Sequence, residues 1–193
     1  MQTNNEKPAD NSEATHSKYS PSKIALLATC PGYVSRPLTQ EEEEDDFSPS
    51  AVGTRVHGAL ETQNPDMLLT KHERSLYTAA NNMVGILRGM MEKEVGTADF
   101  EVLPEHKFPG ILFNPDDPEQ TGTADVLFRH GNTSMIIDYK MGMVPVSNPE
   151  VNSQFIYYGL LEFAERPECE RIILAVIQPS QQDALKIAAF YRT

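Results

Sequence analysis

The sequence is short of cysteine and lacks long apolar runs, and each shortage excludes a class of protein. Its two cysteines, Cys30 and Cys169, lie far apart in the chain. They cannot supply a four-cysteine zinc or iron–sulfur site, and a lone disulfide is not expected in a reducing cytosol. No apolar run approaches the roughly 20 residues that span a bilayer, and residues 1–19 lack the basic start and apolar stretch of a signal peptide. We therefore expect a cytoplasmic protein with free cysteines and no membrane partner.

Basic residues are also few. The sequence has 16 Lys and Arg against 28 Asp and Glu, a formal net charge of −12. This balance argues against nucleic-acid binding over a broad surface, because phosphate contacts need Lys and Arg. Residues 1–50 hold nine acids and four bases, a net charge of −5, so part of the imbalance lies in the least apolar part of the chain. Any binding to DNA is expected to be weak, local or assisted by a partner.

Composition predicts one domain with a polar tail. Residues 1–19 have almost no apolar side chains and are expected to be disordered, whereas residues 20–193 suit a single domain. Six consecutive acids, Glu41 to Asp46, repel one another and predict a solvated acidic loop at about 38–50. A role for this loop in mimicking DNA or attracting metal ions is the alternative interpretation.

Hydrophobic periodicity predicts the elements of the domain. We expect helices at 20–30, 51–63, 69–95 and 150–164. We expect strands at 100–108, 122–129, 134–139, 171–178 and 186–191, with a tight turn at 130–132. Helix positions expected to face the core include Ile24, Leu27, Ala28, Met90 and Leu160. This order of elements predicts an α/β fold, with a small mixed central β-sheet flanked by helices.

Two neighbouring strands carry the polar residues that point to chemistry. Asp125 ends the stretch Gly-Thr-Ala-Asp, and Asp138 and Lys140 belong to the stretch Ile-Ile-Asp-Tyr-Lys. A carboxylate in an apolar strand is costly unless it is paired or bound to metal, and residues two apart in a strand share a face. Two acids and one ammonium together suit metal-assisted phosphodiester hydrolysis. Salt bridges among the three residues are the structural alternative.

Two helices add polar pairs at a spacing of four residues. His57 and Glu61 lie four apart on one expected helix, and Gln154 and Tyr158 lie four apart on another. Residues with this spacing share a helix face. Taken alone, each pair is explained by ordinary surface or polar helix positions.

Taken in order, these residues resemble the RecB-like branch of the PD-(D/E)XK nuclease superfamily, over about residues 20–178. The elements of the resemblance are Ser-x-Ser at 20–22, Cys-Pro at 30–31, Gly-x-x-x-His at 53–57, Glu105, Gly-Thr-Ala-Asp at 122–125, Asp-Tyr-Lys at 138–140, and Gln-x-x-x-Tyr at 154–158. The chain looks most like a phage-encoded member related to recombination and CRISPR-associated exonucleases. The resemblance implies a restriction-endonuclease-like core.

The resemblance also implies roles for the site residues. It implies that a metal ion is bound by the side chains of His57, Asp125 and Asp138 and by the backbone carbonyl of Tyr139. Lys140 would be the catalytic lysine. Gln154 and Tyr158 would line the site and contact the DNA backbone or support Lys140. Glu61 and Glu105 are two further carboxylates, either of which would support the ligands or bind a second metal ion.

The expected function is that of a Mg²⁺- or Mn²⁺-dependent DNA nuclease, by preference an exonuclease, in phage or prokaryotic recombination, repair or replication. A phage protein of this kind would work in the host cytoplasm, with DNA and a recombination or replication protein as partners. The alternative is an inactive relative that binds DNA or protein. Related members with Cys-Pro carry an iron–sulfur cluster that needs three further cysteines near the C-terminus, and the chain has only Cys169 there, so no cluster is expected. No Gly-x-x-x-x-Gly-Lys-Ser/Thr motif for a helicase is present.

Overall fold

The computed structural model describes residues 21–30, 32, 46–109 and 122–192. The predicted tail at 1–19 and most of the predicted acidic loop at about 38–50 lie outside the described residues. None of the helices in the described part of the chain has the length and apolar character that crossing a bilayer requires. Cys30 is exposed and Cys169 buried, and both are free.

A five-stranded mixed sheet forms the centre of the fold, with strands in the order β1-β2-β3-β4-β5. The strands are β1 (Glu101–Phe108), β2 (Gly122–His130), β3 (Thr133–Tyr139), β4 (Arg171–Ile177) and β5 (Leu185–Tyr191). Only β3 and β4 are parallel, and the other neighbours are antiparallel. A parallel pair needs a crossover connection, which the helix between β3 and β4 supplies.

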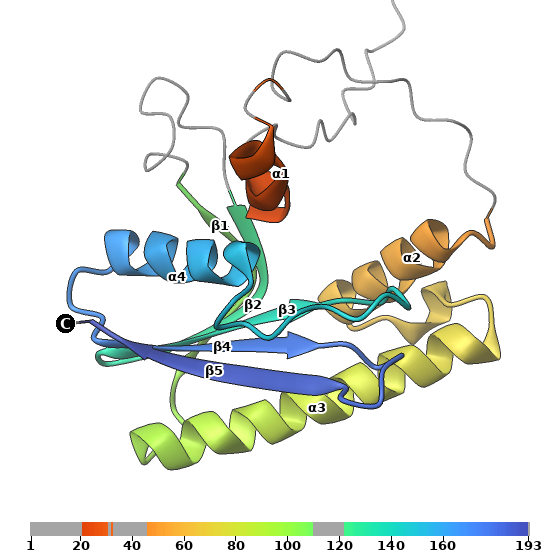
Figure 1. The fold of residues 1–193 in the computed structure, drawn as a ribbon. Coiled ribbons are helices and arrows are strands. Elements are labelled where there is room, and N and C mark those ends of the chain that lie inside the picture. The colour runs from red at the N-terminus through yellow and green to blue at the C-terminus, as the bar shows by residue number, and fades with distance from the viewer. Residues whose placement is uncertain (1–20, 31, 33–45, 110–121, 193) are drawn as a thin grey trace, which may run out of the picture.

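Helices cover both faces of the sheet (Figure 1). They are α1 (Ile24–Thr29), α2 (Pro49–Thr62), α3 (Lys71–Val95) and α4 (Ser153–Glu165), with short 3₁₀ turns at Pro21–Lys23 and Pro65–Met67. In Figure 1, α4 lies on one face and α3 on the other, while α2 sits beside α3 near one end of the strands. The α/β class and the mixed, helix-flanked sheet expected from the sequence are confirmed.

The central strand explains why the core has two halves. Every residue of β3 is buried, as expected for a strand covered on both faces. Met135, Ile137 and Tyr139 pack in the half that contains α2 and α3. Ile136 packs in the half that contains α4. Alternation along β3 therefore sends successive side chains to opposite halves.

Some predicted core positions are wrong. Helix α1 has no buried residue, because this six-residue helix contacts the rest of the described structure mainly at α4. Ala28 is exposed and Leu27 is half-buried, whereas Ile24, also half-buried, packs against the α4 half of the core as expected. Met90 is 39% exposed and Leu160 is 55% exposed. Their helices turn the adjacent residues Met91 and Leu161 inward instead.

A buried ion pair joins α2 to the start of α3. Glu73 is fully buried and accepts hydrogen bonds from the backbone N–H groups of Leu69 and Thr70, while the Thr70 hydroxyl accepts the Glu73 N–H. This reciprocal capping box satisfies donors that a helix start leaves free. Arg55 of α2 donates to the same carboxylate, with its Nε 2.8 Å from Oε1. The contact fixes α2, and with it His57, against α3.

Acid should remove the contribution of Glu73 to stability. Burial raises the pKa of Glu73, but the hydrogen bonds from Thr70 and Arg55 lower it by more than burial raises it. The folded-state pKa therefore lies below the ordinary 4.5. The contribution is therefore complete above pH 4.5 and is lost as the pH falls through the lower, folded-state pKa. Glu73→Gln should destabilise the protein by about 2 kcal/mol at neutral pH. In urea unfolding, the difference in unfolding free energy between this variant and the wild type should shrink as the pH falls from 4.5 through the folded-state pKa of Glu73. A difference independent of pH would contradict the assignment.

Candidate functional site

Strands β2 and β3 separate where the two predicted acids lie. Their paired register ends at Val126 opposite Ile137. One residue further along, the Asp125 carboxylate accepts a hydrogen bond from the backbone N–H of Tyr139. The Asp125 side chain thus accepts the hydrogen bond that a backbone carbonyl of β2 would otherwise accept. This bond holds Asp125 at the end of β3, beside Asp138.

The neighbouring strand β1 is irregular at the same level. Its register pairs Pro104 with Val126 and His106 with Ala124, and leaves Glu105 and Asp125 unpaired between them. Glu105 has a φ of 46°, which is uncommon for a residue with a side chain. In a regular strand, residues an odd number of positions apart point to opposite faces of the sheet. Here Leu103 and Phe108 of β1 pack in the same α4 half of the core, and so do Ala124 and Leu127 of β2. The alternation of side chains is therefore interrupted in both strands. This break turns both carboxylates toward α2.

The backbone at Glu105 should store measurable strain. Glu105→Gly and Glu105→Ala both delete the carboxylate, but only glycine adopts a positive φ without steric cost. The glycine variant should therefore be more stable than the alanine variant by about 1 kcal/mol. Chemical denaturation of the two proteins without metal measures this difference. If the alanine variant were equally stable, the strained backbone would not be a feature of the folded protein.

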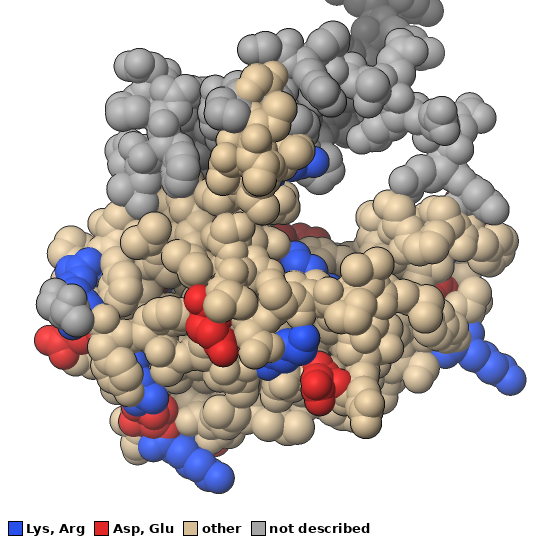
Figure 2. Space-filling model, viewed as in Figure 1, with Lys and Arg blue, Asp and Glu red and all other residues tan. Residues whose placement is uncertain are grey.

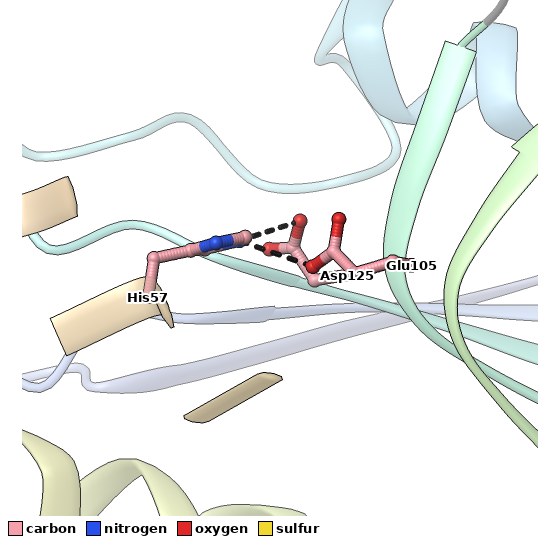
Figure 3. Close-up of side chains that lie close together, drawn as sticks. All are labelled: His57, Glu105 and Asp125. Carbon is pink, nitrogen blue, oxygen red and sulfur yellow. Dashed lines mark ion pairs between the residues drawn. The ribbon is translucent and has the colours of Figure 1, made fainter. Parts of the chain in front are cut away.

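His57 approaches these two carboxylates from α2 (Figure 3). Its Nε2 lies 2.9 Å from Asp125 Oδ1 and 3.7 Å from Glu105 Oε1. Its ring packs edge-on against Tyr139, with 5.9 Å between ring centroids. Within the described part of the chain, His57, Glu105 and Asp125 offer one ligand atom each, all within 4.8 Å of one another. They form a compact set of donors of the type that holds metal ions.

Protonation in this set follows from its crowded charges. The hydrogen bond with Asp125 raises the pKa of His57 to about 9, against the opposing effect of burial. Burial raises the pKa of Glu105 to about 7, and the charge of Asp125 adds to this rise. In the absence of a cation, His57 is therefore the positive partner of Asp125 at neutral pH. A cation bound to the imidazole must displace that proton.

Asp138 lies in a second group of contacts beside the first. It is almost completely buried, and its Oδ2 is 2.6 Å from the Lys140 Nζ. Its Oδ1 accepts a hydrogen bond of 3.1 Å from Gln154 Nε2. Burial raises the pKa of Asp138 to about 6, although Lys140 opposes the rise and Asp125 adds to it. The pKa of Lys140 is raised, because attraction to Asp138 outweighs its own burial.

The start of α4 positions this second group. Asn152 caps the helix through the Gln154 N–H, and the capped turn begins the helix at Ser153, later than the sequence predicted. The Tyr158 hydroxyl donates to the Thr123 carbonyl at 2.6 Å and lies 3.4 Å from Asp138 Oδ1. Gln154 Nε2 lies 3.3 Å from the same hydroxyl. Helix α4 is thus tied both to β2 and to the carboxylate of β3.

The predicted site residues therefore form two neighbouring groups. His57, Asp125 and Glu105 form the compact set, and Asp138 lies outside it with Lys140, Gln154 and Tyr158. Glu61 is exposed, and its charge contributes to the raised pKa of Glu105. Tyr139 contributes its backbone N–H to Asp125 and its ring to His57.

Sequence reasoning overlooked Gln178 just after β4. It is a buried amide, 1% exposed, whose side chain bonds to the backbone of the segment that follows Lys140. A polar residue directly after an apolar strand is the only signal in the sequence.

The visible face of the molecule is hollowed between α2 and the part formed by α4 and α1 (Figure 2). Basic and acidic side chains are both visible at the floor of this hollow, and uncharged residues form most of its sides. A charged floor within an uncharged surround is compatible with local rather than extended electrostatic contact with a ligand.

Comparisons with known proteins add a family. A search of curated proteins gives no match. A solved structure titled "Crystal structure of SSO0001" is 15% identical to this chain, and the match covers 89% of this chain and 77% of that one, with a TM-score of 0.26. A likeness this low carries no argument about the present site. Residues 16–189 match the family model described as "Protein of unknown function (DUF2800)". Because this match spans most of the sequence, the chain belongs to the DUF2800 family.

Proposed function

We propose that this protein is a divalent-metal-dependent nuclease that hydrolyses phosphodiester bonds in DNA. The observation that carries the proposal is the meeting of His57, Glu105 and Asp125, within 4.8 Å of one another, beside the Asp138–Lys140 pair. The charge of Asp125 contributes to the pKa values of both Asp138 and Lys140, so the two groups act as one electrostatic cluster. The PD-(D/E)XK resemblance of the sequence supports the same proposal.

The donor set fits a divalent cation. Carboxylate oxygens suit Mg²⁺ and Mn²⁺, and an imidazole nitrogen favours the transition metal. Buried Asp138 Oδ2 is paired with the Lys140 ammonium, 2.6 Å away. A carboxylate oxygen has more than one lone pair, so the same oxygen could also coordinate a cation. We therefore assign His57 and Asp125 as the central ligands. Glu105, Asp138 and the backbone carbonyl of Tyr139 are the further ligands.

Each residue then has a role that its geometry allows. A bound divalent ion would neutralise phosphate charge and acidify a water molecule. Lys140, held by Asp138, would orient that water or stabilise negative charge as it develops on the phosphate. Gln154 and Tyr158 fix the Asp138 carboxylate through Oδ1, which leaves Oδ2 directed to Lys140. Glu61 is outside this arrangement.

A second candidate function is binding without catalysis. His57 with Asp125, and Lys140 with Asp138, form two ion pairs that are satisfied without any cation. The formal charge of −12 also weakens attraction to DNA. An inactive relative that binds DNA or a recombination or replication protein would show both features.

A cleavage assay separates these functions. Purified protein is incubated with linear and covalently closed circular DNA in Mn²⁺, Mg²⁺ or EDTA. The proposed nuclease degrades DNA only with a divalent ion, and loss of linear but not circular DNA identifies an exonuclease. Binding to DNA without cleavage in any metal would favour the non-catalytic function.

A further inference from the structure

The segment that follows Lys140 crosses the end of the sheet and leads into α4. Its first residue, Met141, packs against the half of the core formed by α2 and α3. Val146, five residues later, packs against the α4 half. The loop between them, residues 142–145, is exposed throughout. Both ends of this loop are therefore anchored, one in each half of the core.

The backbone of the loop is held by side chains from beyond β4. The Gln178 amide donates to the carbonyls of Gly142 and Val144, at 2.8 and 2.7 Å, and accepts the Val146 N–H at 3.1 Å. Ser180 and Gln181 donate to the carbonyls of Gly142 and Met143, and Lys186 Nζ donates to the Val146 carbonyl. Ordering a loop in this way costs conformational entropy. These hydrogen bonds restrain the loop backbone, and none of them involves a side chain of residues 142–145.

Those apolar side chains point away from the protein. Met143 is 77% exposed and Val144 is 80% exposed. They are the two most exposed of the large apolar side chains in the described part of the chain. A fixed backbone therefore presents two apolar groups to solvent, three and four residues after the lysine of the proposed site.

We propose that Met143 and Val144 contact the nucleobases next to the phosphate held at the proposed metal site beside Lys140, and separate them from their stacked neighbours. This inference rests on the nuclease proposal and extends it. Three residues of chain reach at most about 11 Å, and bases stack about 3.4 Å apart. Met143 can therefore reach bases within about three nucleotides of the phosphate, and Val144 is the next residue along the chain. Methionine is among the apolar side chains that proteins insert between base steps.

Size favours DNA over a protein as the occupant. In a protein with a net charge of −12, phosphate attraction is weak, so a DNA strand held at the proposed site would need contacts that do not depend on charge. Contact with bases provides this. A stable protein partner needs roughly 800 Å² on each side, which is much more than two side chains at the tip of a loop can offer.

The test uses short single strands that carry the fluorescent base 2-aminopurine at the first, second or third nucleotide from one end. Its fluorescence rises when the base loses its stacked neighbours. The loop variant carries both Met143→Ser and Val144→Ser. The control, called the α3 variant, carries both Ile86→Ser and Met90→Ser, and so loses two exposed apolar groups from α3. Helix α3 lies on the opposite face of the sheet from α4 (Figure 1). Binding is measured at several salt concentrations, and cleavage is measured with Mn²⁺.

We expect the wild type and the α3 variant to raise the fluorescence equally. The loop variant should lose that rise and bind roughly tenfold more weakly, the scale for losing apolar contacts of this size. Its dependence on salt should be unchanged, because no phosphate contact is removed. A loop variant equal to the wild type in fluorescence and affinity would overturn this inference alone and would favour a protein occupant. A changed salt dependence would also overturn it. A wild type that neither binds nor cleaves DNA would overturn the nuclease proposal as well.

Discussion

Lys140→Ala should lower DNA cleavage by roughly a hundredfold or more, the scale for losing one positioned transition-state contact. Binding of DNA should change little, because one ammonium among many charges contributes little to affinity. The Lys140 Nζ lies 2.6 Å from Asp138 Oδ2, so its removal leaves a buried carboxylate without its cation. The pKa of Asp138 should then rise further, and the protein should remain folded at a somewhat lower melting temperature.

Single-turnover cleavage and equilibrium binding measure the two effects separately. Lys93→Ala is the matched control, since it removes an exposed lysine from the end of α3. It should cleave at the rate of the wild type. If Lys140→Ala also cleaves at that rate, Lys140 is only the ion-pair partner of Asp138 and has no part in the chemistry.

Metal-dependent stabilisation should require both aspartates. Because an ion binds the folded site and not the unfolded chain, Mn²⁺ at about 100 times its dissociation constant should add about 2.7 kcal/mol to the stability of the wild type. The double variant Asp125→Asn and Asp138→Asn keeps the shape of both side chains while it removes their charges. It should lose both this stabilisation and detectable cleavage.

Glu61→Gln is the control for the aspartate variants. It removes an exposed carboxylate on α2, one turn after His57, and should keep the response to Mn²⁺. Melting curves with and without Mn²⁺ compare the three proteins. A double aspartate variant that is stabilised as much as the wild type would place the ion elsewhere in the chain.

Much of the fold could be predicted because its signals are local. The apolar strands and the turn at Gly131, which has a φ of 54°, define the β2–β3 hairpin. The hairpin brings Asp125 level with Asp138, and the Asp-Tyr-Lys spacing places Lys140 beside Asp138. These relations depend on residue spacing and strand geometry, which a sequence displays directly.

Other parts of the site depend on tertiary contacts that spacing does not encode. The compact set contains Glu105 rather than Asp138, because the backbone at Glu105 departs from ordinary strand geometry. Gln178 holds a loop more than thirty residues earlier in the chain. Leu160 is 55% exposed, although its type suits a core. Each outcome depends on which neighbouring element covers the residue, and that is known only once the elements have packed.

The most direct measurement is a crystal structure of the Lys140→Ala protein with Mn²⁺ and a short DNA strand, with the ion located by its anomalous scattering. We predict one ion bound to His57 Nε2 and the Asp125 carboxylate, with Glu105 or Asp138 as a further ligand and a phosphate oxygen of the DNA on its open side. An ion bound elsewhere, or DNA bound away from these residues with His57 still paired to Asp125, would contradict the account.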